Sequence, residues 1–151
     1  MRHGSAPQSP SSSANCTAVV VNRLLGARAT FVALVLGTVA IGLAVHLGGA
    51  SFGPNVRDVL GDALWAMMIA WWVGALAPHR SPVARAGAAL AICGAVEASQ
   101  LVNTPALDAL RNLPGGHLIL GSGFDPRDFG AYALGVLAAA MLERVARRRR
   151  S

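Results

Sequence analysis

The sequence contains no lysine and few charged residues of any kind, and each shortage narrows the class of protein. Charged residues make up 13% of the 151 residues, whereas 54% are hydrophobic. A soluble domain carries about 25% charged residues, so much of the surface of this chain need not face water. All thirteen basic residues are arginine. Together with the abundant alanine and glycine, the use of arginine as the only basic residue is explained more simply by a GC-rich coding bias than by a chemical role of arginine.

Cysteine is also scarce, and its two occurrences have no spacing typical of a metal or redox site. Cys93 falls inside an apolar run, where cysteine usually behaves as a small hydrophobe. Cys16 is not preceded by the apolar run that a lipoprotein signal needs. We therefore expect no disulfide, no metal site and no cofactor.

Four apolar segments are the main positive feature of the sequence. They predict an all-α polytopic membrane protein, a bundle of four transmembrane helices, because a helix needs about 20 apolar residues to cross a bilayer. The last segment is shorter than that. We expect it either to start inside a protein-lined recess or to gain length from Val145 and Ala146. The expected spans are residues 29–47, 59–77, 84–102 and 129–142.

The two ends of the chain differ in composition from the membrane domain, which we place at residues 23–146. Residues 1–22 are predicted to form a disordered or interfacial N-terminal tail, since their first part is rich in serine and proline and has no periodicity. Residues 147–151 are predicted to form a basic C-terminal tail.

The positions of the arginines predict the orientation. Ten lie before the first span, between the second and third spans, or after the fourth, and three lie in the other loops. The positive-inside rule then places both termini in the cytoplasm and the protein in the cell membrane. Anionic lipid headgroups, and not nucleic acid, are the expected partners of this positive charge.

Small residues recur at every fourth position along the last two spans. Such ladders let helix backbones approach closely inside a membrane, so they predict a compact bundle. The third span has Gly87, Ala91, Ala95 and Ser99, and the fourth has Ala131, Gly135 and Ala139.

Polar residues gather at one depth, on the side opposite to most of the arginines. Two carboxylates lie about one turn below this surface on the expected topology, a third begins the fourth span, and the preceding loop adds an arginine. A tryptophan, a glutamine and a tyrosine follow the three carboxylates at a distance of three or four residues, which places them on the same helix faces. The expected polar pocket consists of Asp62, Trp65, Glu97, Gln100, Arg111, Asp128 and Tyr132.

Each of these residues has a structural explanation beside a functional one. Asp62 suits the first turn of a helix, and Trp65 suits a packing or interface position. Glu97 is harder to explain, because a carboxylate within a span usually faces the bundle interior and has a partner. Three interpretations of Glu97 stay open: a structural ion pair with Arg111, a site for a ligand or substrate, and a proton-coupled role.

Several short motifs occur in a defined order along the chain. They are Gly61–Trp65 (GDALW), Glu97–Leu101 (EASQL), Arg111, and Leu120–Phe124 (LGSGF) followed by Asp128, Tyr132 and Gly135. The set resembles an uncharacterised bacterial membrane family called domain of unknown function 2809, over about Ile41 to Glu143. It is more distantly similar to VanZ-like membrane proteins.

The resemblance implies which positions are signatures of the family and implies no reaction. The implied signature positions are Asp62, Trp65, Glu97, Gln100, Arg111 and Asp128. The chain departs from the family pattern at His46 and Pro114, where arginine is usual, and at Pro126, where an aromatic residue is usual. The pocket is therefore expected to carry less positive charge than is typical of the family.

These features predict a small cell-envelope protein whose outer-leaflet pocket engages a lipid or lipid-linked headgroup. The expected partners are membrane lipids, with a lipid-linked envelope intermediate among the candidates. One alternative is a membrane-embedded acid/base enzyme acting on a lipid-linked substrate, but the sequence shows no nucleophile or metal for it, so enzyme activity stays open. A second alternative is a structural or assembly partner in a larger membrane complex. A transporter would normally show internal repeats or broken helices, which we do not see.

Overall fold

The computed structural model describes residues 11–48, 53–102, 104–113, 116 and 124–149, and within these residues the ordered elements are helices. This agrees with the predicted all-α class. The elements are α1 (Ser11–Gly48), α2 (Pro54–Leu76), α3 (Pro82–Ser99), the short α4 (Pro105–Arg111) and α6 (Asp128–Arg148).

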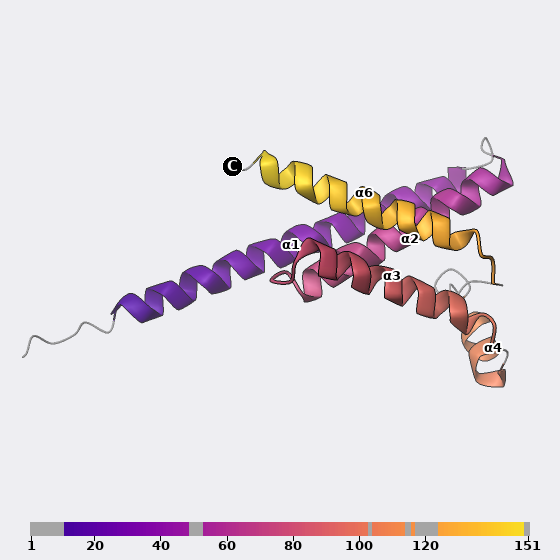
Figure 1. Cartoon of the computed structure of the whole chain (residues 1–151), viewed down its shortest axis with the longest axis horizontal. Helices are drawn as coiled ribbons and strands as arrows, with labels where there is room; N and C mark the ends of the chain where they lie inside the picture. Colours follow the sequence, from indigo (N-terminus) through magenta and orange to yellow (C-terminus); the bar gives the residue numbers. More distant parts are fainter. Residues whose placement is uncertain (1–10, 49–52, 103, 114–115, 117–123, 150–151) are drawn as a thin grey trace, which may run out of the picture.

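The four long helices lie alongside one another and alternate in direction (Figure 1). Helix α2 is central, because it contacts α1, α3 and α6, and α3 also contacts α6. The beginning of α1 and the end of α6 point toward the same end of the bundle, and the first turns of α1 extend beyond the other helices (Figure 1). We call the end where α2 ends, α3 begins and α6 ends the arginine-rich end. The opposite end, where α2 begins, α3 ends and α6 begins, is called the polar end.

Proline sets the first residue of three helices. Pro54, Pro82 and Pro105 each occupy the start of a helix, where the missing N–H is not needed and the fixed φ angle suits the helix. Ser81 and Thr104 precede two of these helices, and their side-chain oxygens accept hydrogen bonds from the N–H three residues on, at 3.2 and 3.3 Å. The local sequence therefore determines where these helices begin.

Three helices in the described part of the chain are long and apolar enough to cross a membrane: α1 over Cys16–Gly48, α2 and α6. Helix α3 packs with them but has only 18 residues. It also carries Arg85 and Glu97, which lower its apolar character. The protein is thus a helical membrane protein, and the predicted count of four spans is not confirmed.

Two of the predicted boundaries differ from the structure. Helix α6 runs over 21 residues, about 31 Å at ~1.5 Å per residue, so it reaches across a bilayer by continuing through Val145 and Ala146. The predicted N-terminal tail was placed at residues 1–22, but residues 11–22 belong to α1. Asn22, Arg23 and Arg28 interrupt the apolar residues between Cys16 and the first span, but the helix itself continues without a break, so one helix contains both. Residues 1–10 lie outside the described part of the chain.

The two predicted ladders of small residues have different outcomes. On α6, Ala131, Gly135 and Ala139 are buried, as predicted. On α3, Gly87 and Ala91 are exposed. The side chains that α3 buries are Arg85, Ala89, Cys93 and Glu97. Because α3 is made largely of alanine, both of its faces are apolar. The face that turns toward the bundle is therefore the one that carries Arg85 and Glu97, which need buried partners.

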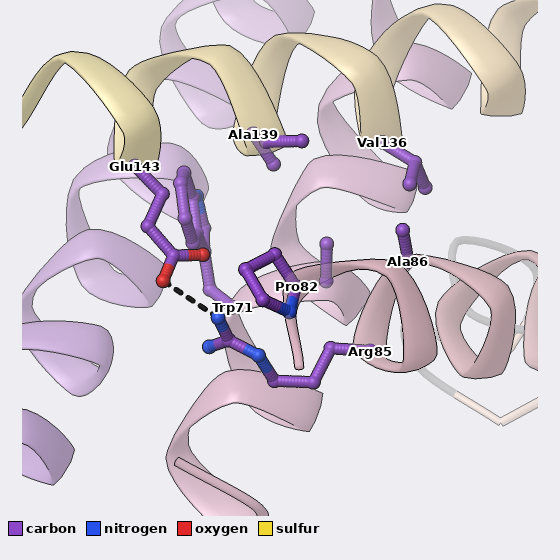
Figure 2. Close-up of a pocket in the computed structure, with 9 residues that line it drawn as sticks. Trp71, Pro82, Arg85, Ala86, Val136, Ala139 and Glu143 are labelled. Atoms are coloured by element: carbon purple, nitrogen blue, oxygen red, sulfur yellow. Dashed lines mark hydrogen bonds and ion pairs between the residues drawn. The ribbon is translucent and has the colours of Figure 1, made fainter. Parts of the chain in front are cut away.

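At the arginine-rich end, a buried ion pair joins α3 to α6. Arg85 is 4% exposed, and its Nη2 donates a 2.6 Å hydrogen bond to Oε1 of Glu143. Figure 2 shows the guanidinium group reaching below Pro82 toward this carboxylate. The same group lies over the ring of Phe31, 5.1 Å from its centroid. Arg85 therefore links α3 to both α1 and α6.

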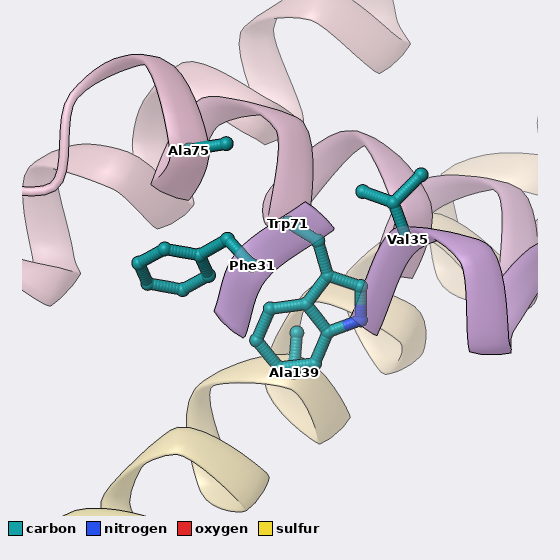
Figure 3. Packing of buried hydrophobic residues seen from close by; sticks show 5 residues of the cluster. All are labelled: Phe31, Val35, Trp71, Ala75 and Ala139. Carbon is teal, nitrogen blue, oxygen red and sulfur yellow. The ribbon is translucent and has the colours of Figure 1, made fainter. Parts of the chain in front are cut away.

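The apolar core lies between α1, α2 and α6. Trp71 packs among Phe31, Val35, Ala75 and Ala139 (Figure 3). Close packing at this point depends on glycine: a Cβ atom added at position 74 would lie 2.6 Å from the ring of Phe31. A second buried cluster joins α2, α3 and α6 next to the polar end. Its members are Ala66, Ala89, Cys93, Tyr132 and Val136.

Candidate functional site at the polar end

Glu97 lies at the centre of the polar end and is fully buried. Its carboxylate accepts three hydrogen bonds. The hydroxyl of Tyr132 donates to Oε2 at 2.9 Å, Nε2 of Gln100 donates to Oε2 at 3.1 Å, and the backbone N–H of Asp125 donates to Oε1 at 2.8 Å. These donors replace the water that a buried carboxylate loses. Glu97 therefore connects the last turn of α3 to α6 and to the segment before α6.

The segment before α6 turns sharply, and Asp125 organises the turn. Oδ1 of Asp125 accepts a 2.9 Å hydrogen bond from the N–H of Arg127, and the carbonyl oxygen of Asp125 accepts a 3.0 Å bond from the N–H of Asp128. Helix α6 then begins at Asp128. A carboxylate in this first turn is favoured by the helix dipole. The turn that Glu97 holds through Asp125 thus determines where Asp128 lies.

Asp128 of α6 lies close to Asp62 of α2, so that the two carboxyl groups interact electrostatically. Helices α2 and α6 also touch through their backbones, because a Cβ atom added at Gly135 would collide with the carbonyl group of Ala63. Glycine at this position lets the two helices approach closely. Two neighbouring carboxyl groups are stable when they share a proton or hold a cation between them.

Aromatic rings border these carboxylates. The centroids of Trp65 and Tyr132 are 5.6 Å apart, and Phe129 lies 6.2 Å from Tyr132 and 6.3 Å from Phe124. The indole N–H of Trp65 is buried and has no hydrogen-bond acceptor in the described part of the chain. Aromatic faces attract cations, and tryptophan does so most strongly. The polar end therefore combines carboxylates with aromatic surface.

The structure brings together six of the seven residues that the sequence predicted for the pocket. Arg111 is the last residue of α4, but its side chain lies outside the described part of the chain. The pairing of Glu97 with Arg111 therefore stays a prediction. The glycine-containing loop motif at residues 120–123 also lies outside the described residues. The residues that meet at the polar end are Asp62, Trp65, Glu97, Gln100, Asp128 and Tyr132.

Two of the polar contacts in the structure were not predicted from the sequence. One is the backbone N–H of Asp125, which donates to Glu97 across 28 residues and leaves no mark in the side-chain pattern. The other is the Arg85–Glu143 pair at the opposite end. Arg85 counted only as one of the ten arginines of one membrane side. The sequence did contain an indication of this pair, since Arg85 and Glu143 each interrupt an apolar segment near the arginine-rich end.

Within the described ranges, no three His, Cys, Asp or Glu side chains gather in a way that could hold a metal ion. Carboxylates, aromatic rings and a buried tyrosine are thus the groups that the polar end offers to a ligand. Their chemistry suits hydrogen bonding, proton exchange and the binding of an organic cation.

Fold and site together define a helical membrane protein that buries ionisable groups at both ends of its bundle. The chain belongs to the family described as Protein of unknown function (DUF2809), whose model matches residues 53–136, more than half of the 151 residues. The match includes every residue predicted for the pocket. It confirms the resemblance seen in the sequence, while the more distant similarity to VanZ-like proteins stays a prediction. No solved structure matches the chain.

Proposed function

We propose that this chain is a cell-envelope protein that binds an amphiphile at its polar end. The ligand is a lipid or lipid-linked molecule whose headgroup carries an amine or is zwitterionic. The observation that carries the proposal is the proximity of the Asp62 and Asp128 carboxyl groups across the α2–α6 interface, where the two helices approach closely at Gly135 and Ala63. A headgroup ammonium placed between them would relieve their mutual repulsion.

The distribution of charge at this end favours a cationic group. Glu97 adds a third carboxylate, but its oxygens accept three internal hydrogen bonds, so it supports the site and does not face the ligand. Arg57 lies beside Asp58, with Nε and Oδ1 3.9 Å apart, and both side chains are exposed. Among the described side chains, no guanidinium group pairs with Asp62 or Asp128. A purely anionic ligand would therefore be repelled.

Residues near the two carboxylates can also bind the anionic group and the apolar chain of an amphiphile. Arg127, which is exposed and precedes Asp128, would take the phosphate or carboxylate of a zwitterionic headgroup. Phe124 and Phe129 are part-exposed at the same end and would lie against the acyl or prenyl chain.

The proposed location follows from the charge of the whole chain. The arginine-rich end faces the cytoplasm under the positive-inside rule. Both termini then lie in the cytoplasm of a cell membrane, and the polar end faces the outer leaflet. The location would give the pocket access to lipid-linked intermediates of the envelope.

Native mass spectrometry of the purified protein tests the proposal. The protein is released from nanodiscs that contain equal amounts of phosphatidylethanolamine, which bears an amine, and phosphatidylglycerol, which does not. We expect phosphatidylethanolamine to be retained at the polar end and to be lost in Asp62→Asn and Asp128→Asn. Asp108→Asn is the matched control, because it removes the same charge from an exposed position on α4. Retention in all three variants alike would contradict the proposal.

A second candidate is a membrane-embedded acid/base enzyme. It is favoured by the proximity of two carboxyl groups, since paired carboxyls in different environments divide into acid and base. Comparison of the lipids of a deletion strain with those of its parent distinguishes the two functions. Accumulation of one lipid with loss of a related one indicates a reaction. An unchanged lipid profile together with specific retention indicates binding alone, and an unchanged profile without retention leaves the assembly-partner alternative.

A further inference from the structure

A recess opens at the arginine-rich end between α2, α3 and α6, at the opposite end of the bundle from the proposed amphiphile site. Its lining includes Trp71, Pro82, Arg85, Ala86, Ala140 and Glu143 (Figure 2). The recess is open on one side, and its cavity volume of about 20 Å³ has room for about one water molecule. We call it the Arg85 recess.

The Arg85 recess contains a donor that lacks an acceptor. Arg85 is 4% exposed, and its Nη2 is satisfied by Glu143. Its Nε–H is buried and has no acceptor within the described residues. A buried charged donor without an acceptor is unfavourable, so an acceptor from outside the protein would be bound here. The cavity that Arg85 lines is the place where such an acceptor fits.

The charges around the Arg85 recess identify the ligand as an anion. Glu143 is already shared, since it accepts from Arg85 and, at 2.7 and 3.0 Å, from Arg147. Further guanidinium groups belong to the same end of the bundle: Arg80 precedes α3 by two residues, and the last turns of α6 carry Arg144 and more arginines, all exposed. Positive charge therefore exceeds negative charge at this end.

The surroundings of the Arg85 recess also favour a lipid over a soluble anion. Leu76 ends α2 and Val83 lies in the first turn of α3, so both flank the connection beside the recess. They are 74% and 82% exposed, as is expected of side chains that face hydrocarbon. Arg85 lies one turn inside this boundary. The opening is thus placed where headgroups of a bilayer meet their acyl chains.

We propose that the Arg85 recess binds the phosphate group of an acidic lipid headgroup. The phosphate lies at the opening of the recess, where the guanidinium group of Arg85 donates to it directly or through one water, and the exposed arginines of this end neutralise it. This site is independent of the amphiphile site, because it uses none of the residues of the polar end.

The test again uses the whole purified chain. Native mass spectrometry after release from nanodiscs of phosphatidylglycerol and phosphatidylcholine should show that one phosphatidylglycerol is retained, in addition to any zwitterionic lipid held at the polar end. Ala140→Leu and Ala86→Leu fill the recess from α6 and α3 without changing any charge. Each should weaken retention about tenfold, the effect of one lost charge-assisted hydrogen bond. Ala88→Leu is the control, since Ala88 is exposed on α3 and does not line the recess.

Two variants that fill the recess are used, so that one still tests the proposal if the other does not fold. Thermal unfolding shows whether each variant is folded. Addition of inorganic phosphate distinguishes the source of the ligand. If phosphate alone stabilises the wild-type protein and not the filled variants, the phosphate site stands and its ligand is free phosphate. Loss of phosphatidylglycerol from the wild-type protein on release, or its full retention in a folded Ala140→Leu or Ala86→Leu protein, would overturn the proposal. Asp62→Asn should leave this retention unchanged, which separates the result from that at the polar end.

Discussion

The hydroxyl of Tyr132 donates a 2.9 Å hydrogen bond to Oε2 of Glu97, although 35 residues separate them in the chain. This bond joins α6 to the last turn of α3 inside the bundle. Because Glu97 is fully buried, each of its hydrogen bonds offsets part of the loss of water around a carboxylate. The pair therefore holds together the walls of the polar end.

Removal of the tyrosine hydroxyl should destabilise the protein. In Tyr132→Phe, one oxygen of the buried Glu97 loses a donor, so we expect a loss of about 1–3 kcal/mol in the free energy of unfolding. Thermal or denaturant unfolding in detergent measures it. Phe129→Tyr is the matched control, since it changes one hydroxyl on an exposed neighbouring ring and should alter stability by less than about 0.5 kcal/mol. Equal effects of the two variants would contradict the role given to the Tyr132–Glu97 bond.

Substitution of Glu97 should depend on the shape of the new side chain. Glu97→Ala leaves the Asp125 N–H and the Tyr132 hydroxyl without their acceptor and opens a cavity, so we expect a loss of about 3 kcal/mol or more. Glu97→Gln keeps one acceptor oxygen and the volume, and should retain more of the stability. Yields of monodisperse protein and unfolding midpoints compare the two. If alanine is tolerated as well as glutamine, Glu97 does not hold the segment before α6.

Glycine at position 135 should be required for the contact of α6 with α2. Gly135→Ala places a Cβ atom against the carbonyl group of Ala63, and overpacking of this kind destabilises by about 1–3 kcal/mol. Gly130→Ala is the control on the same helix, because a Cβ atom there meets no atom within 4 Å. Unfolding midpoints that shift equally in both variants would show that the backbones are not in close contact.

The two ion pairs of Glu143 should have unequal effects on stability. Removal of its charge in Glu143→Gln leaves the buried Arg85 uncompensated, and loss of one partner from a buried pair destabilises by about 3–5 kcal/mol. Arg147→Gln removes the other partner, whose side chain is 62% exposed, and should change stability by less than about 1 kcal/mol. Denaturant unfolding of the two variants makes the comparison. Similar losses in both would place Arg85 in water and not in the bundle.

The orientation can be tested by labelling. In a background without Cys16 and Cys93, single cysteines at His117 and Arg80 should react oppositely with a membrane-impermeant thiol reagent applied to intact cells. Position 117 should be labelled, because the positive-inside rule places Arg80 in the cytoplasm. Labelling of position 80 from outside would reverse the orientation and place the polar end in the cytoplasm.

Much of the fold follows from local features of the sequence. The shortage of charge and the long apolar runs determined the class of helical membrane protein, since burial in a bilayer depends on composition over about 20 residues. Pro54, Pro82 and Pro105 begin helices for a local reason, the fixed φ angle and missing N–H of proline. The location of Asp62, Glu97 and Asp128 at the same end of the bundle also followed from their positions along the helices.

Only the tertiary structure decided which faces and which distant residues meet. Helix α3 buries Arg85, Ala89, Cys93 and Glu97 and exposes Gly87 and Ala91, a choice that its alanine-rich sequence does not encode by hydrophobic periodicity. The Arg85–Glu143 bond spans 58 residues, and the acceptor of the Asp125 N–H lies 28 residues away. Such contacts depend on the summed packing of several helices and on the need to satisfy every buried charge, and neither is a property of a local segment.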